Sequence, residues 1–372
     1  MALSTIPFSG LGADASNQGV NFRNLIINGD MSIAQRGTSA TGQTSSGYKT
    51  VDRIRMVTGS DATFTVSQAS ETPTGQGFNK SFKVVATTGD NSLGSSQYNI
   101  PAQIRMEGQM LQTMKKGTSS AESVTFSFWV RATVTGTYIL ELNDDDNDRY
   151  ISQSYTISTT NTWEKKTVTF AGDTTGAFDN DNAKSLTINF WGGAGTDFTS
   201  GSLATSWGGP DDTTRAVGQV NAFASNNDAW QITGLQMEVG TSASDFEFLP
   251  YDVNLQRCMR YLQQIGKNVA MNGNTPTGGN RLLQGQREAS GSAAAKVIYY
   301  LPVPLRTNPT LSKTDINFRQ DGTNTDFNSM SGSLFGGILE LSVTNTSDFN
   351  VAKAMQVRCT SADSFIRFDS EL

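Results

Sequence analysis

Two tryptophans have the side-chain type and the setting that carbohydrate recognition uses. Trp191 precedes two glycines and Trp207 precedes Gly-Gly-Pro, so both indoles are expected at strand ends or in loops. The face of a pyranose ring stacks on an indole, while nearby Asn, Asp and Gln side chains hydrogen-bond its hydroxyl groups. We take Trp191 and Trp207 as candidate sugar-binding residues. The alternative is that each ring plugs the end of a β-sandwich or packs at a subunit contact.

An acidic run between two expected strands has the alternating carboxylates of a calcium loop, namely Asp144, Asp146 and Asp148. Ca²⁺ needs several hard oxygen ligands at once. The run lacks the glycine and the distal glutamate of an EF-hand, and Asp and Asn favour turns for backbone reasons alone. We expect a solvated hairpin turn and assign no metal ligand. Asp144, Asp146 and Asp148 remain weak candidates for a structural calcium.

The chain contains no histidine. This excludes Ser-His-Asp and Cys-His nucleophile systems, HExxH metalloproteases and His-ligated zinc. A pair of carboxylates could still hydrolyse a glycan, but among 34 acidic residues some pair always fits that pattern. We therefore expect a protein that is not an enzyme and has no cofactor.

Charge and hydropathy exclude two classes of partner. The 34 acidic and 28 basic residues give a net charge of −6 without a Lys/Arg run that could follow a phosphate backbone, so we expect no nucleic acid. No stretch of about 18 apolar residues and no signal peptide are visible, so we expect no membrane insertion. Cys258 and Cys359 are too few for a disulfide scaffold, and we expect free thiols.

Period-two alternation dominates the chain and predicts an all-β fold. With 36 glycines and 9 prolines, the composition is typical of short strands joined by polar turns. The clearest strand is Val124–Val130, where alternate residues are apolar. Within another expected strand, Trp230–Val239, the apolar residues change from one alternate set of positions to the other, which predicts a bulge at Thr233 and Gly234. Further strands are expected at 64–66, 82–86, 138–142, 166–170, 186–191, 299–305, 338–343 and 365–368.

Two helices are expected within this pattern. The clearer one follows Pro250, with Asp252 as its cap and Gly266 as its end. It divides the chain into an N-terminal arm at 1–20, a β-sandwich at 21–251, a linking helix at 252–266 and a smaller C-terminal β-sandwich domain at 267–372. A weaker helix is expected at Gly108–Lys116.

Several sequence blocks resemble, in order, a module of bacteriophage virion and tail-fibre proteins. The first block is Asn24–Thr38, and the last runs from Phe246 to Tyr261. Between them lie Ile104–Gln109, Ser127–Val130, Asn161–Glu164 and Ile232–Gly240. The resemblance covers 24–265, and an ordered set of blocks is far more specific than a lone motif.

The resemblance implies a jelly-roll sandwich similar to carbohydrate-binding modules, carried on a phage particle. It also implies that the arm at 1–20 anchors the chain to other virion proteins. A homotrimer that attaches to host-surface glycan, made and assembled in the host cytoplasm, is expected by the same analogy. Glycan-cleaving tailspikes often have a long β-helix repeat, which is not visible here. The acidic pair that binds calcium in such modules is replaced by Thr233–Gln236, which argues against that metal.

A second reading fits the composition equally well. The protein could decorate the capsid, or form a head fibre, without recognising a specific receptor. The location on the particle separates the two readings, because one predicts the tail and the other the capsid surface.

Overall fold

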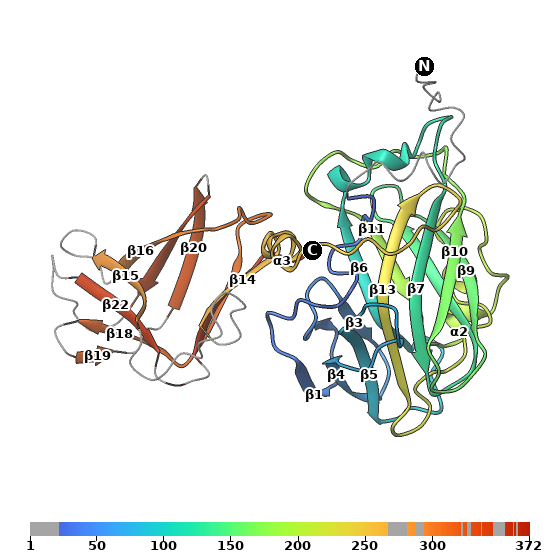
Figure 1. Cartoon of the computed structure of the whole chain (residues 1–372), viewed down its shortest axis with the longest axis horizontal. Coiled ribbons are helices and arrows are strands. Elements are labelled where there is room, and N and C mark those ends of the chain that lie inside the picture. Colours follow the sequence, from blue (N-terminus) through green and yellow to red (C-terminus); the bar gives the residue numbers. More distant parts are fainter. Residues whose placement is uncertain are drawn as a thin grey trace, which may run out of the picture. The chain divides into compact units, whose positions relative to one another are not determined.

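The computed structural model describes residues 22–266, 281–287, 294–320, 323–325, 329–335, 337–344, 354–359, 361 and 364–372 (Figure 1). The chain divides into two compact units. Unit 1 comprises the chain up to Ser32, Ala40–Gly47 and Ile54–Leu249, and unit 2 comprises Ile33–Ser39, Tyr48–Arg53 and Pro250–Leu372. The expected arm at 1–20 lies outside the described residues.

Unit 1 contains two β-sheets. The first, called sheet A here, has the order β1-β4-β5-β13-β7-β10: β1 Ser39–Gln43, β4 Thr63–Ala69, β5 Ser81–Thr88, β13 Ala229–Val239, β7 Val124–Ala132 and β10 Glu164–Phe170. Neighbouring strands from β4 to β10 are antiparallel.

Sheet B has the order β2-β3-β6-β11-β8-β9, and β12 also pairs with β6. Its strands are β2 Gly47–Tyr48, β3 Arg55–Thr58, β6 Tyr98–Glu107, β11 Lys184–Phe190, β8 Gly136–Asp144, β9 Arg149–Ile157 and β12 Gly193–Ala194. The neighbours from β3 to β9 are antiparallel. The short helices of this unit are η2 Gly108–Met110, η3 Gln112–Met114, α2 Thr196–Thr199 and η4 Asp212–Thr214.

The core of unit 1 is formed by alternate residues of facing strands, because successive side chains of a strand point to opposite faces. Phe128 of β7 and Phe190 of β11 meet with ring centroids 5.2 Å apart at an interplanar angle of 90°, an edge-to-face arrangement that aromatic pairs favour. Phe190 also packs on Trp230 of β13 at 5.8 Å. The all-β prediction is confirmed, and its jelly-roll-like sandwich corresponds to unit 1.

The predicted phase break in β13 is present. The register of β13 against β7 shifts between Thr233 and Gln236. Gly234 has a φ of +62°, and a Cβ there would lie 2.5 Å from the ring of Phe78. Glycine is therefore needed both for the backbone angle and for the space.

The expected linking helix at 252–266 is wrong in its extent. Helix α3 spans Tyr251–Met259 with Pro250 as N-cap, so Asp252 lies in the first turn and is not the cap. Residues Leu262–Gly266 form strand β14, which pairs with β23. Leu262–Gly266 is thus extended because it pairs with β23, about 100 positions later, although its local sequence pattern is helical. The weaker helix at 108–116 is replaced by the two 3₁₀ turns η2 and η3.

Unit 2 is also built of β-strands. One sheet has the order β14-β23-β17 and the other β19-β18-β22-β15-β16-β21-β20. The bounds are β15 Arg281–Arg287, β16 Ala294–Tyr300, β17 Thr310–Thr314, β18 Ile316–Gln320, β19 Thr323–Thr325, β20 Ser329–Phe335, β21 Ile338–Thr344, β22 Ala354–Cys359 and β23 Phe365–Asp369. The strand expected at 299–305 ends at Tyr300. The described core residues include Leu339, Leu341, Ile366 and Phe368.

A buried ionic cluster ties early residues into unit 2. Arg36 Nη2 lies 2.8 Å from Asp369 Oδ2, a partner 333 positions away. Arg53 forms an ion pair with Glu371 and stacks over the ring of Tyr261 at 3.5 Å. The domain boundary expected at 21–251 is therefore wrong for Ile33–Ser39 and Tyr48–Arg53, because Arg36 and Arg53 form ion pairs with Asp369 and Glu371 near the end of the chain.

Asp52 is fully buried within the same cluster. Its carboxylate accepts hydrogen bonds from Gln35 N at 2.9 Å and Gln35 Nε2 at 2.6 Å, and it lies 3.9 Å from Arg36 Nη1. Burial raises the pKa of Asp52 to about 6, although Arg36 and Gln35 act in the opposite direction.

Among the described residues, no helix is both long and apolar enough to cross a membrane. Cys258 is a buried thiol. The side chain of Cys359 lies outside the described part of unit 2.

Candidate functional site

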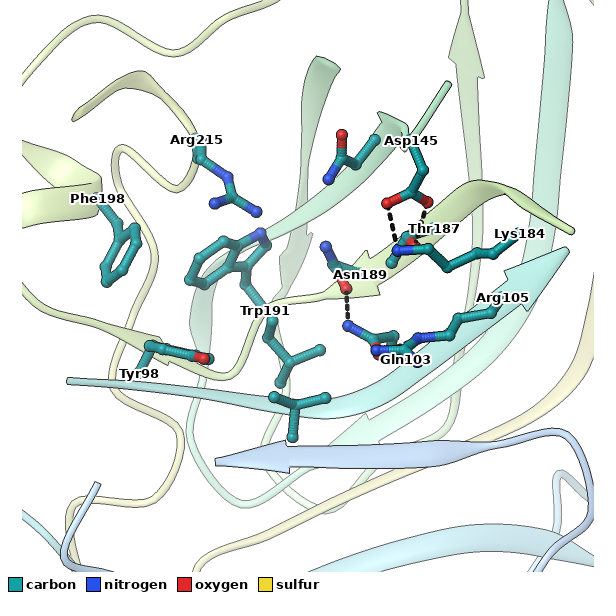
Figure 2. Close-up of a pocket in the computed structure, with 13 residues that line it drawn as sticks. Tyr98, Gln103, Arg105, Asp145, Lys184, Thr187, Asn189, Trp191, Phe198 and Arg215 are labelled. Carbon is teal, nitrogen blue, oxygen red and sulfur yellow. Dashed lines mark hydrogen bonds and ion pairs between the residues drawn. The ribbon is translucent and has the colours of Figure 1, made fainter. Parts of the chain in front are cut away.

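A pocket of about 240 Å³ opens on the outer face of sheet B (Figure 2). Its lining comes from β3, β6, β11 and the end of β8, together with α2 and the residue that follows η4. Tyr98 and Arg105 lie near opposite ends of β6, about 20 Å apart along the strand at about 3.3 Å per residue. The lined surface is therefore an elongated groove, which we call the outer groove.

The alternation of β11 explains why polar side chains reach this face. Leu186, Ile188 and Phe190 are buried in the sandwich core. The intervening Thr187 and Asn189 therefore point outward, as does Trp191 directly after the strand, and all three line the outer groove.

One end of the outer groove is aromatic. Tyr98, Trp191 and Phe198 form a ring cluster with centroid distances of 6.1 Å for Tyr98–Trp191, and 5.4 Å for Tyr98–Phe198 and for Trp191–Phe198. Trp191 is only 1% exposed, whereas Tyr98 and Phe198 are half-buried. Trp191 thus forms the floor, and the other two rings present more surface to a ligand.

The centre of the outer groove carries two amides held in fixed orientations. Gln103 Nε2 donates to Asn189 Oδ1 at 2.8 Å, and Asn189 Nδ2 donates to Glu141 Oε2 at 3.0 Å. Gln103 Oε1 accepts from Arg55 Nη1 at 2.8 Å and from Arg105 Nε at 3.1 Å. Each side-chain amide has two N–H groups, and these bonds use one of each. Both amides lie in the floor of the groove, where Gln103 is 7% and Asn189 2% exposed.

Glu141 lies beneath the outer groove and is fully buried. Its carboxylate accepts hydrogen bonds from Trp191 Nε1 at 2.9 Å and from Arg215 Nε at 2.6 Å. Burial acts against the charge of Arg215, but Glu141 and Asp212 outweigh it and raise the pKa of the guanidinium. Glu141 therefore fixes an aromatic ring, an amide and a cation at once.

The other end of the outer groove is charged. Lys184 Nζ lies 2.5 Å from Asp145 Oδ1, and Thr187 Oγ1 donates to Asp145 Oδ2 at 2.7 Å. Arg105 lies beside them, as Figure 2 shows. The groove thus runs from aromatic rings through amides to a cluster of charges.

The two tryptophans singled out from the sequence are not brought together. Trp191 lines the outer groove, whereas Trp207 is not among its lining residues. Trp207 is half-buried, and its Nε1 donates a hydrogen bond to Ala171 O at 2.8 Å. Lys116 Nζ lies 5.2 Å from the centroid of its ring. The neighbouring glycines correctly indicated a loop, but that loop does not line the outer groove.

The acidic run forms the turn between β8 and β9. Asp144 is fully buried, and its Oδ2 lies 2.5 Å from Lys116 Nζ. Its Oδ1 accepts from the backbone of Asp146 and Asn147 at 3.0 and 3.1 Å. Asp146 and Asp148 are exposed. Within the described residues, no group of three or more His, Cys, Asp or Glu side chains is arranged to hold a metal ion.

A second pocket of about 290 Å³ lies on sheet A, and we call it the Phe248 pocket. Its lining includes Trp129, Phe246 and Phe248, with the ring centroids of Phe246 and Phe248 4.9 Å apart. Phe248 is 52% exposed. Trp129 is half-buried at an outward position on β7 and lines this pocket.

Sequence reasoning missed Tyr98, Phe198 and Arg215. Tyr98 lies at the start of a strand without an aromatic neighbour in sequence, Phe198 lies in the short helix α2, and Arg215 directly follows η4. In the sequence, only the alternate polar residues of β11, Thr187 and Asn189, could have indicated the groove. In a sheet whose other face forms the core, such polar positions next to a tryptophan indicate a second, polar face, although Thr187 and Asn189 are themselves buried in the floor of the groove.

No protein-family model and no curated protein matches the sequence. Solved structures align at low scores. A tailspike protein 4 domain of bacteriophage CBA120 aligns over 58% of this chain at 12% identity and a TM-score of 0.30, and the alignment spans only 21% of that chain. The C-terminal family 22 carbohydrate-binding module of Clostridium thermocellum Xyn10B aligns over 51% of this chain and 88% of its own at 12% identity and a TM-score of 0.28.

The xylan-binding domain of Paenibacillus barcinonensis Xyn10C aligns over 55% of this chain and 94% of its own at 11% identity and a TM-score of 0.26. The fold assignment rests on the strand order, and the site rests on its own side chains.

Proposed function

We propose that the outer groove binds a glycan. The observation that carries the proposal is the succession of half-buried rings, Tyr98 and Phe198, and of two fixed amides in the floor, Gln103 and Asn189, along one groove. Aromatic rings stack on the apolar face of a sugar, and oriented amides bind its hydroxyls. Trp191 supports the rings from below, which modifies the platform role expected for it.

The proposed function is binding without catalysis and without a metal. Hydrolysis by carboxylates needs one group that can give a proton and a second that can attack or activate water. Glu141 is buried and held by Arg215, Trp191 and Asn189, and Asp145 is held by Lys184 and Thr187. Both carboxylates are thus committed to structural contacts.

We further propose that the chain is a tail-fibre or receptor-binding component of a phage particle that attaches to host-surface glycan. The ordered sequence blocks between 24 and 265 support this role. A shallow site binds weakly, but several copies raise the effective concentration. A homotrimer anchored to other virion proteins through 1–20 would supply these copies.

The binding proposal is tested by applying the full-length protein to an array of bacterial oligosaccharides and polysaccharides. We expect binding of at least one class, lost in Tyr98→Ala and retained in Lys83→Gln, which alters an ion pair on sheet A. Absence of binding to every glycan would contradict the proposal. Release of reducing sugar from a bound glycan would contradict its non-catalytic part.

The attachment role has its own test. Excess purified protein, shown to be folded, is added to the host bacterium before the phage. Blocked adsorption supports a receptor-binding role. Unimpaired adsorption, together with antibody labelling of the capsid on intact particles, would favour the capsid-decorating alternative.

A further inference from the structure

The charged end of the outer groove has an excess of cationic groups. Arg105 and Lys184 line this end, where Asp145 is the one carboxylate among the lining residues. Arg215 lies over the aromatic end and is paired with Glu141 and Asp212. The chain as a whole carries a net charge of −6. The charged end therefore has two cations against one carboxylate, in a chain that is negative overall, and this local balance favours an anionic ligand.

At this end, Lys184 has more capacity than Asp145 to form a hydrogen bond with a ligand. Both oxygens of Asp145 receive protein donors, from Lys184 at Oδ1 and from Thr187 at Oδ2. The Lys184 side chain is 35% exposed against 14% for Asp145. An ammonium has three N–H donors, and the bond to Asp145 uses one of them.

Arg105 extends this donor surface. It is half-buried, and its Nε donates to Gln103 Oε1 at 3.1 Å. That bond orients the planar guanidinium beside Lys184. A guanidinium matches the two oxygens of a carboxylate in geometry, whereas neutral sugar hydroxyls make no such paired contact.

We infer that the ligand of the outer groove is an acidic glycan, with a uronate-type carboxylate at Arg105 and Lys184 and a neutral sugar face on Tyr98 and Phe198. This inference rests on the proposed glycan binding and adds the chemical class of the ligand. The length of the groove, about 20 Å at about 3.3 Å per strand residue, places the two contacts on different sugar units of one oligosaccharide.

The test uses the full-length protein and a panel of uronate-containing oligosaccharides, namely oligogalacturonates, alginate oligomers and glucuronate-containing oligomers. Each is paired with its carboxyl-reduced form, which keeps the linkages and removes the charge. Affinity is measured by calorimetry for the wild type, Arg105→Gln and Lys184→Gln. Lys83→Gln is the matched control, because Lys83 also forms an exposed ion pair, with Glu71 at 3.1 Å on sheet A.

We expect an acidic member to bind about tenfold or more tightly than its reduced form. Arg105→Gln and Lys184→Gln should each remove most of this difference, with unchanged melting temperatures, and Lys83→Gln should preserve it. Raising the salt concentration should weaken the acidic ligand selectively, because screening acts on exposed charges.

Two other outcomes would overturn the inference in distinguishable ways. Equal affinity for acidic and reduced forms, with neither variant altering it, would leave glycan binding standing and remove the acidic class. Failure of every acidic, reduced and neutral glycan to bind would overturn both the inference and the proposed function.

Discussion

The indole Nε1 of Trp191 donates a hydrogen bond of 2.9 Å to the buried carboxylate of Glu141. A ring on the floor of the outer groove is thereby fixed by a charge that lies below it. The same carboxylate accepts a hydrogen bond from Arg215 Nε at 2.6 Å. The positions of the Trp191 ring and of the Arg215 guanidinium therefore depend on the same buried group. Removing the carboxylate should loosen both.

Glu141→Gln tests this shared dependence. The change leaves Arg215 without its buried partner, and we expect unfolding to become easier by about 2–3 kcal/mol, less than for a fully buried pair because Arg215 is 20% exposed. Urea unfolding measures the loss. The control is Asp212→Asn, which alters an ion pair to the same arginine at a 67% exposed residue and should have a small effect. Equal losses in the two variants would contradict the account.

Trp207 and Tyr98 separate the site derived from the structure from the one expected from sequence. Because Trp207 does not line the outer groove, Trp207→Phe should leave glycan affinity unchanged. Tyr98→Ala should weaken it about five- to tenfold through lost stacking. Calorimetric titration with a glycan identified on the array measures both. The reverse ranking would place the site at Trp207.

We predict that the acidic turn binds no metal and that Asp144 is instead neutralised by Lys116. The pair is almost completely buried, with exposures of 2% and 0%, so Lys116→Met should cost about 3 kcal/mol by leaving a buried carboxylate uncompensated. Calcium or a chelator should not change the melting temperature of the wild type. A calcium-dependent rise in that temperature, abolished in Asp144→Asn, would instead identify a metal site.

Asp52 predicts a specific dependence of stability on pH. The unfolded residue ionises near 3.8, whereas burial raises the pKa of the folded residue to about 6. Between these values the folded state binds more protons, so this contribution to stability is present at low pH and is lost as the pH rises through 6. The loss amounts to about 3 kcal/mol.

Asp52→Asn lacks this titration. The free energy of unfolding of the variant minus that of the wild type should therefore increase by about 2 kcal/mol between pH 4 and pH 7, the rest of the change falling outside this range. Urea unfolding at four pH values across this range measures the difference. A difference that does not change with pH would show that Asp52 ionises normally in the folded protein.

Local patterns predicted the strands of unit 1 well. The apolar residues of Val124–Val130 alternate because one face of the strand packs in the core, and they appear in β7 as expected. The phase break in β13 located its bulge because the change of face and the glycine coincide at Gly234. These features depend on neighbours in sequence, which is why the sequence contained them.

Features that depend on distant partners could not be predicted. Leu262–Gly266 continues a helical pattern locally but pairs with β23, and Arg36 finds Asp369 333 positions later. The outer groove has the same origin, since Tyr98, Asn189 and Arg215 meet only after the strands pair. Trp191 was identified from its residue type, but its burial required knowledge of what covers it.

The most direct test of the central claim follows the five tryptophans of the chain by ¹⁹F NMR after incorporation of 5-fluorotryptophan. Single Trp→Phe variants assign the signals, and an array-positive oligosaccharide is titrated into the full-length protein. The account predicts that the Trp191 signal shifts with ligand while those of Trp129 and Trp207 stay in place. A shift of the Trp129 signal with Trp191 unaffected would place the ligand in the Phe248 pocket and contradict the assignment to the outer groove.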